Sequence, residues 1–148
     1  MTKLLLSIHV LAAILVVGPI TVAASLFPRY ARQDSPVAAL LHRICRGYAV
    51  AGVAVPVFGL ATAIQLGVLT DVWLLTSLAL TAIAAAVLVL AILPGQRLLL
   101  DGGEGHEGDG GAARATASRL AMLTGVFNIL WAVVVVLMIV RPGSTTGA

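Results

Sequence analysis

Residues 120–140, LAMLTGVFNILWAVVVVLMIV, form 21 consecutive positions without a formal charge. An α-helix rises about 1.5 Å per residue, so about 20 apolar residues suffice to cross the hydrocarbon core of a bilayer. The stretch is rich in valine, but it lacks the alternation between two faces that marks a transmembrane barrel strand. Backbone groups in lipid must pair within their own segment, which favours a helix. The stretch therefore predicts a membrane-spanning helix.

Three further charge-free stretches precede it, at residues 4–28, 47–70 and 72–96. The whole 148-residue chain is 60% hydrophobic and 10% charged, against roughly 45–50% and 25% in soluble domains. The first stretch is longer than the roughly 7–15-residue apolar core of a cleaved signal peptide, so we expect it to remain as a span. Short connections place successive helices side by side and antiparallel. The sequence predicts one all-α domain, an antiparallel four-helix transmembrane bundle.

Proline and glycine predict where these helices bend or end. Pro19 and Pro56 each remove a backbone donor and should bend the first and second helices. Pro94, followed by glycine, should end or kink the third helix. Residues 101–111 contain six glycines among acidic residues, which predicts a flexible acidic loop.

Small residues four positions apart let helix backbones approach closely in lipid. Three such pairs predict close helix contacts: Gly47/Ala51, Gly59/Ala63 and Ala82/Ala86.

The distribution of positive charge predicts the orientation. With four spans, Lys3 and Arg141 share one side of the membrane, and seven arginines share the other: Arg29, Arg32, Arg43, Arg46, Arg97, Arg114 and Arg119. The positive-inside rule places the arginine-rich side in the cytoplasm and both termini outside. In so hydrophobic a chain a net charge of +3 indicates membrane orientation rather than nucleic-acid binding. The expected partners are the lipid bilayer and either a larger membrane complex or further copies of the chain.

His9 is the foremost candidate site residue. It lies about 8 Å inside the first span, at a depth similar to Gln65, Thr76 and Ser77 of the next two spans. Ionisable residues at such depth are costly and usually face a bundle interior or a cavity. Neutral imidazole could ligate haem iron or a copper ion, or carry a proton. The alternative is a histidine that hydrogen-bonds Gln65, threonine or serine and joins two helices.

A second candidate lies at the cytoplasmic end of the second helix. His42 and Arg46 are four residues apart on one helical face, which suits an anionic lipid headgroup or a propionate-bearing ligand. The alternative is an ordinary positive-inside cluster. Cys45 is the single cysteine of the chain, which excludes an internal disulfide and predicts an inert thiol. We expect Asn128 to form an interhelical hydrogen bond.

Both tryptophans, Trp73 and Trp131, are expected to pack or to anchor the bundle at the membrane interface. The chain has no phosphate-binding loop, nucleophile elbow, zinc-protease motif or paired-cysteine motif. Soluble-type hydrolase and dithiol redox chemistry therefore lack support.

The order of these features resembles small four-helix membrane proteins related to HemJ-type protoporphyrinogen oxidase and to CopD-like domains. The resemblance is carried by the opening KLLLSIH, which ends at His9, by Phe27-Pro28-Arg29, by the segment WLLTSLAL, and by Asn128 followed by an apolar run to Arg141-Pro142. It implies a bacterial-type inner-membrane protein in which His9 binds haem b. HemJ proteins carry a lysine where Ser77 stands, and serine cannot supply its charge or basicity.

The expectation is thus a small integral membrane protein, a haem-associated accessory subunit rather than a working oxidase. The alternatives are a haem-dependent membrane oxidoreductase of the HemJ type and a small transporter or metal-handling protein.

Overall fold

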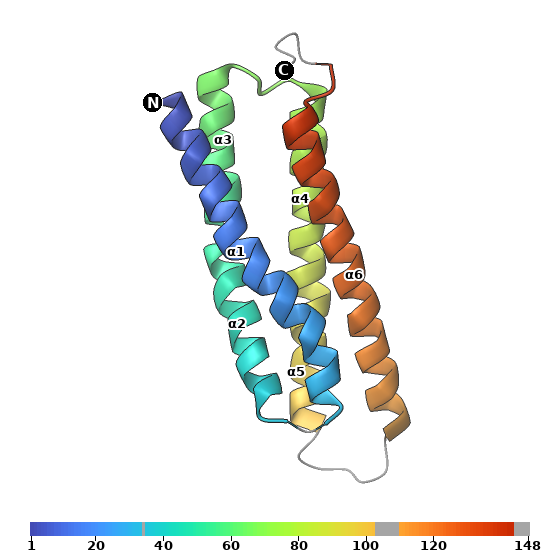
Figure 1. Cartoon of the computed structure of the whole chain (residues 1–148). Helices are drawn as coiled ribbons and strands as arrows, with labels where there is room; N and C mark the ends of the chain where they lie inside the picture. The colour runs from blue at the N-terminus through green and yellow to red at the C-terminus, as the bar shows by residue number, and fades with distance from the viewer. Residues whose placement is uncertain (34, 103–109, 144–148) are drawn as a thin grey trace.

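The computed structural model describes residues 1–33, 35–102 and 110–143. All regular structure in these ranges is helical (Figure 1). The elements are α1 (Thr2–Ala31), α2 (Val37–Ala51), α3 (Ala54–Leu66), α4 (Val72–Ala86), the π-helical segment η1 (Val87–Ile92), α5 (Leu93–Gly102) and α6 (Gly110–Val140).

Four helical rods are long and apolar enough to cross a membrane, judged by length and composition. They are α1, α2 with α3, α4 through α5, and α6, and each contains 30 or 31 residues. This confirms the prediction of an all-α chain with four candidate membrane spans. Every rod includes residues outside the charge-free stretch that predicted it, because helical hydrogen bonding continues into flanking polar turns. The second rod nevertheless ends at Leu66, four residues before the end of its predicted stretch at residue 70.

The rods lie side by side, and their ends gather at two poles (Figure 1). The start of α1, the α3–α4 connection and the end of α6 lie at one pole, which we call the terminal end. The end of α1, the start of α2, the end of α5 and the start of α6 lie at the other, which we call the loop end.

The second rod is interrupted three residues before Pro56. Helix α2 ends at Ala51 and α3 begins at Ala54. Pro56 has no N–H to donate to the carbonyl four residues earlier. That carbonyl, of Gly52, instead accepts the N–H of Val55 at 3.1 Å. The expected effect of Pro56 is therefore seen as a break rather than a smooth bend, whereas α1 runs through Pro19 without interruption.

Of the two effects predicted for Pro94, that it ends or kinks the third helix, the first is wrong. Helix α5 begins at Leu93 and continues through Pro94 to Gly102. The preceding six residues form the wider π-helix η1, at whose end the N–H of Leu93 donates to the carbonyl of Leu88, five residues back. Wide turns of this kind often adjoin irregular points in helices. We attribute η1 to Pro94, whose ring clashes with a regular α-turn before it.

The glycine-rich segment is shorter than predicted at both ends. Asp101 and Gly102 complete α5, and Gly110 and Gly111 begin α6. Glycine costs a helix only about 1 kcal/mol relative to alanine, and a long helix can carry that cost at its terminal turn. The remainder of the predicted loop, residues 103–109, lies outside the described residues.

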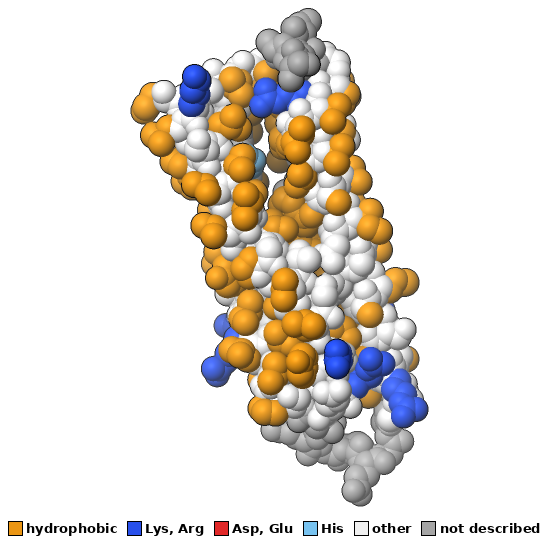
Figure 2. Space-filling model, viewed as in Figure 1, with side chains coloured by type: hydrophobic (Ala, Val, Ile, Leu, Met, Phe, Trp, Pro, Cys, Tyr) orange, Lys and Arg blue, Asp and Glu red, His pale blue; other side chains and the backbone are white. Residues whose placement is uncertain are grey.

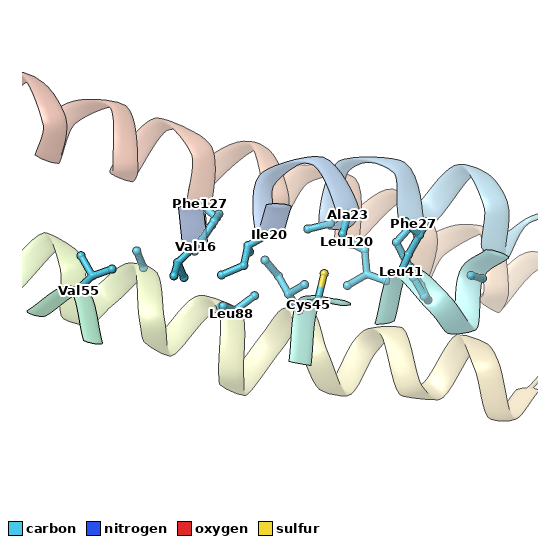
Figure 3. Packing of buried hydrophobic residues seen from close by; sticks show 14 residues of the cluster. Val16, Ile20, Ala23, Phe27, Leu41, Cys45, Val55, Leu88, Leu120 and Phe127 are labelled. Carbon is cyan, nitrogen blue, oxygen red and sulfur yellow. The ribbon is translucent and has the colours of Figure 1, made fainter. Parts of the chain in front are cut away.

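The apolar core occupies the middle of the bundle and its loop end (Figure 3). Phe27 and Ile92 are completely buried there, and Leu120 is nearly so. Further members of the cluster come from every rod: Val16, Ile20, Ala23, Leu41, Cys45, Val55, Ala84, Leu88 and Phe127. Side chains from all four rods interdigitate at this level, so the loop half is the tightly closed half of the molecule.

The rods separate into two pairs toward the terminal end. There α1 packs closely on α3, and α4 packs closely on α6, while α3 has only sparse contact with the second pair. Figure 2 shows a hollow between the two pairs in this half, with a histidine side chain visible within it. The terminal half is therefore the open half of the bundle.

Of the three small-residue pairs, one lies at a helix contact. Ala63 is buried, and Gly59 packs against α1 through the His9 ring. The other two pairs are wrong as predictors of packing within the chain, because all four of their residues are exposed: Gly47, Ala51, Ala82 and Ala86. A spacing of four fixes which residues share a face, but it does not say whether that face turns inward.

The outer surface of the bundle is apolar along its length. Large hydrophobic side chains are exposed on every rod, among them Ile14, Leu60, Leu90 and Ile129. Lysine and arginine side chains gather toward the two ends (Figure 2). Soluble monomers rarely expose so much contiguous apolar surface, which favours hydrocarbon as the surrounding solvent.

Candidate functional site

His9 of α1 is held by the backbone of α3 at the interruption of the second rod. Its Nδ1 lies 2.9 Å from the carbonyl oxygen of Val55. The ring packs over Gly59: a Cβ added there would lie 2.8 Å from His9 Cε1 and 3.1 Å from Nδ1. Glycine at position 59 therefore makes room for the imidazole between the two helices.

The partner of His9 fixes its tautomer. A carbonyl oxygen can only accept, so Nδ1 carries the proton and donates it to Val55. In neutral imidazole the lone pair then resides on Nε2, which is the usual metal-binding arrangement of a histidine whose other nitrogen donates to a carbonyl. The Nε2 of His9 therefore carries the lone pair that could bind a metal ion or accept a proton, and the side chain is only partly buried.

The predicted polar layer around His9 does not assemble through hydrogen bonds. Gln65 and Thr76 are exposed, and the Thr76 hydroxyl donates to the carbonyl of Val72 in its own helix. Ser77 is completely buried, and its hydroxyl donates to the carbonyl of Trp73 at 2.8 Å. Serine and threonine hydroxyls in helices often donate to the carbonyl four residues back. The hydroxyl protons of Thr76 and Ser77, which were expected to face His9, are used in this way.

A second histidine is held at the loop end by a residue that the sequence analysis did not single out. Gln96 of α5 is 1% exposed, and its Oε1 lies 2.9 Å from His42 Nδ1. Its Nε2 donates to the buried Cys45 Sγ at 3.6 Å. Gln96 therefore joins α5 to α2 through both ends of its amide, and His42 has the same Nδ1–H tautomer as His9.

The structure separates His42 from Arg46. Both residues belong to α2, but Arg46 is exposed whereas His42 is half-buried and turned to Gln96. Cys45 lies inside the apolar cluster (Figure 3).

Gln96 could have been found in the sequence from one signal, since it is a polar residue within an otherwise apolar stretch. Its partners could not, because sequence alone does not show which helix faces it.

Three residues lie together at the terminal end, where α4 begins and α6 ends. Asp71 is the N-cap residue of α4, and its carboxylate accepts the indole N–H of Trp73 at 3.0 Å. The Arg141 guanidinium lies over the Trp73 ring, 5.5 Å from its centroid. The cation–π contact joins the beginning of α4 to the residue that follows α6, whereas the hydrogen bond to Asp71 lies within the first turn of α4.

The described residues contain no group of three histidine, cysteine, aspartate or glutamate side chains placed to hold a metal ion. A copper ion needs more than one protein ligand, whereas haem brings four ring nitrogens of its own and needs one axial histidine at the least. Within the described residues, the Nε2 of His9 could supply one axial ligand to a haem, but no set of ligands for a bare copper ion is present there. Comparisons with protein-family models, curated proteins and solved structures find no match to this chain.

Proposed function

We propose that the protein is an antiparallel four-helix transmembrane bundle that binds haem b through His9, as a haem-associated membrane subunit. The observation that carries the proposal is the hydrogen bond from His9 Nδ1 to the Val55 carbonyl. It fixes the imidazole with its Nε2 lone pair free, in a ring position that Gly59 makes possible. When bound, haem would supply a redox-active iron.

The half of the bundle that carries His9 supports this assignment. The two helix pairs separate there, and the hollow between them opens beside apolar side chains (Figure 2). A porphyrin is a flat apolar ligand, and such ligands bind in concave, mostly apolar sites with few polar groups. Ser77 is buried, and its hydroxyl is bonded to its own helix, so it offers no base. We therefore favour a binding or electron-transfer role over a HemJ-like oxidase.

The haem assignment is tested by purification in detergent from cells supplied with haem. The wild type should show a Soret band that His9→Ala abolishes. His42→Ala is the matched control, because it removes an imidazole with the same tautomer at the opposite end of the bundle. A colourless wild type, or a His9→Ala variant that retains the full Soret band, would refute the assignment.

We further propose an inner-membrane orientation with the loop end in the cytoplasm. The seven arginines that flank the two longer connections support it through the positive-inside rule. A protease site inserted between α5 and α6 should be protected in intact cells with a permeabilised outer membrane, and it should be cleaved in inverted vesicles. Cleavage in the intact cells would reverse the orientation.

A further inference from the structure

Helix α6 carries three buried polar atoms with no hydrogen-bond partner among the described residues. They are Thr124 Oγ1, Asn128 Oδ1 and Trp131 Nε1. Thr124 is 3% exposed, so bulk solvent does not satisfy its hydroxyl. Asn128 uses its other amide atom, Nδ2, to donate to Ser25 Oγ at 3.5 Å, as the sequence analysis expected of an interhelical contact.

The three side chains follow one line along α6. At about 100° per residue, positions 124, 128 and 131 fall within an arc of about 60°, and they span about 10 Å along the helix axis. Phe127 and Val134, which are buried, belong to the same side of α6. The polar line therefore lies on the face that α6 turns toward the bundle, at the middle of the span.

Among the described residues of the neighbouring helices, the Ser25 hydroxyl reaches this line, and its Oγ accepts from Asn128 Nδ2. On α4, which packs against α6, Ser77 and Thr81 each donate their hydroxyl proton to a carbonyl of α4 itself. The buried side chains of the facing stretch of α1 include Val16 and Ile20, which are apolar. An unpaired polar group in a hydrocarbon environment costs several kcal/mol. Three on one line indicate that a ligand pairs with them.

The chemistry of the three atoms identifies that ligand. The Trp131 N–H needs an acceptor, Asn128 Oδ1 needs a donor, and the Thr124 hydroxyl can use either. Successive positions on the line lie about 6 and 4.5 Å apart along the helix axis, and a bridging water joins two polar atoms that each lie about 2.8 Å from it. A single hydroxyl head group cannot reach atoms spread over about 10 Å. A row of small neutral molecules, each of which both donates and accepts hydrogen bonds, can reach all three atoms.

We propose that the α6 polar line, Thr124, Asn128 and Trp131, holds a file of bound water in the middle of the span. The file enters from the terminal end, where the helix pairs separate around the hollow (Figure 2). It stops at the closed core of the loop end, where Ile92 is buried together with Phe27 and Leu120, which Figure 3 labels. The file thus lies beside the apolar core, to which Phe127 belongs, and the closed loop end keeps the water from crossing the bundle.

The experiment uses the two tryptophans of the chain. The full-length apoprotein, labelled with ¹⁵N at the indole nitrogens, is placed in lipid nanodiscs, and magnetisation transfer from water to each indole N–H is recorded. Trp73→Phe assigns the two signals. The Trp131 signal should show a water cross-peak, and Asn128→Leu should reduce it at least several-fold. Ile129→Leu, which changes an exposed residue of the same helix, is the matched control and should leave it unchanged.

A Trp131 indole without a water cross-peak, or with cross-peaks to lipid protons in its place, would overturn the proposal. Thr124→Val gives a second and independent measure. Removal of a hydrated hydroxyl takes a partner from the file and should lower the midpoint of thermal unfolding, whereas removal of a dry unpaired hydroxyl would raise it. Because the measurements use the apoprotein, a failure to bind haem leaves their outcome unaffected.

Discussion

Substitution of Gly59 by alanine tests the packing that orients His9. The added Cβ would lie 2.8 Å from His9 Cε1 and 3.1 Å from Nδ1, closer than van der Waals contact allows. The imidazole must withdraw by about 0.6 Å to restore an ordinary contact distance. If the ring moves directly away, its 2.9 Å bond to the Val55 carbonyl lengthens to about 3.5 Å, outside the range of an N–H···O hydrogen bond.

Two opposing contributions set the change in stability. Alanine in place of glycine stabilises a helix interior by about 0.5–1 kcal/mol. Loss of one hydrogen bond within a membrane bundle costs about 0.6–1 kcal/mol, and the displaced ring adds strain. The free energy of unfolding of Gly59→Ala should therefore equal that of the wild type or be lower. Gly47→Ala, where a Cβ meets nothing within 4 Å, should gain the full helix contribution, so the two variants should differ by about 1 kcal/mol or more.

Reversible unfolding in detergent, followed by circular dichroism, measures the difference between the two variants. The ¹⁵N signals of the His9 ring report the tautomer, and Gly59→Ala should lose the dominance of the Nδ1–H form while Gly47→Ala retains it. If Gly59→Ala matched Gly47→Ala in stability and left the His9 signals unchanged, the packing argument for His9 would be refuted.

Two further substitutions test the contacts of α5. Gln96→Leu removes the shared partner of His42 and Cys45 and should lower the free energy of unfolding by about 1–3 kcal/mol; an unchanged value would mean that this buried amide adds nothing. Gly95→Ala places a Cβ 2.8 Å from Leu120 Cδ2, and the overpacking cost of about 1–3 kcal/mol should exceed the helix gain of about 0.5–1 kcal/mol. Combining it with Leu120→Ala should cost less than the two separate losses, and strict additivity would argue against the collision.

The sequence was a sound guide to the helical rods because the bilayer requirement is local. An uncharged stretch of sufficient length is apolar whatever its neighbours are, and in hydrocarbon its backbone can pair only with itself or within a closed sheet. Four such stretches therefore predicted the four rods that the structure contains. Sequence was a weaker guide to irregularities. It placed the effect of Pro56 correctly within a few residues, but it did not foresee η1 before Pro94.

The same contrast applies to the candidate site. His9 could be selected from sequence because a histidine within an apolar stretch is unusual. Its partner, the carbonyl of Val55, could not, since every residue carries a carbonyl and only the approach of α1 to α3 selects one. Gln65 and Ser77 were matched to His9 by depth alone. Depth leaves the angular position of a residue on its helix undetermined, and the structure turns Gln65 outward and bonds Ser77 to its own helix.

By itself the sequence determined the solvation that each segment requires. Four stretches are too apolar for water and long enough for a spanning helix, and arginines flank them on one side. Only the tertiary structure decided which faces meet, and with them the position of His9 over Gly59, the burial of Gln96 between α2 and α5, and the polar line on α6. The physical reason is that solvation is a property of each residue, whereas pairing depends on the rotation and tilt of two helices together.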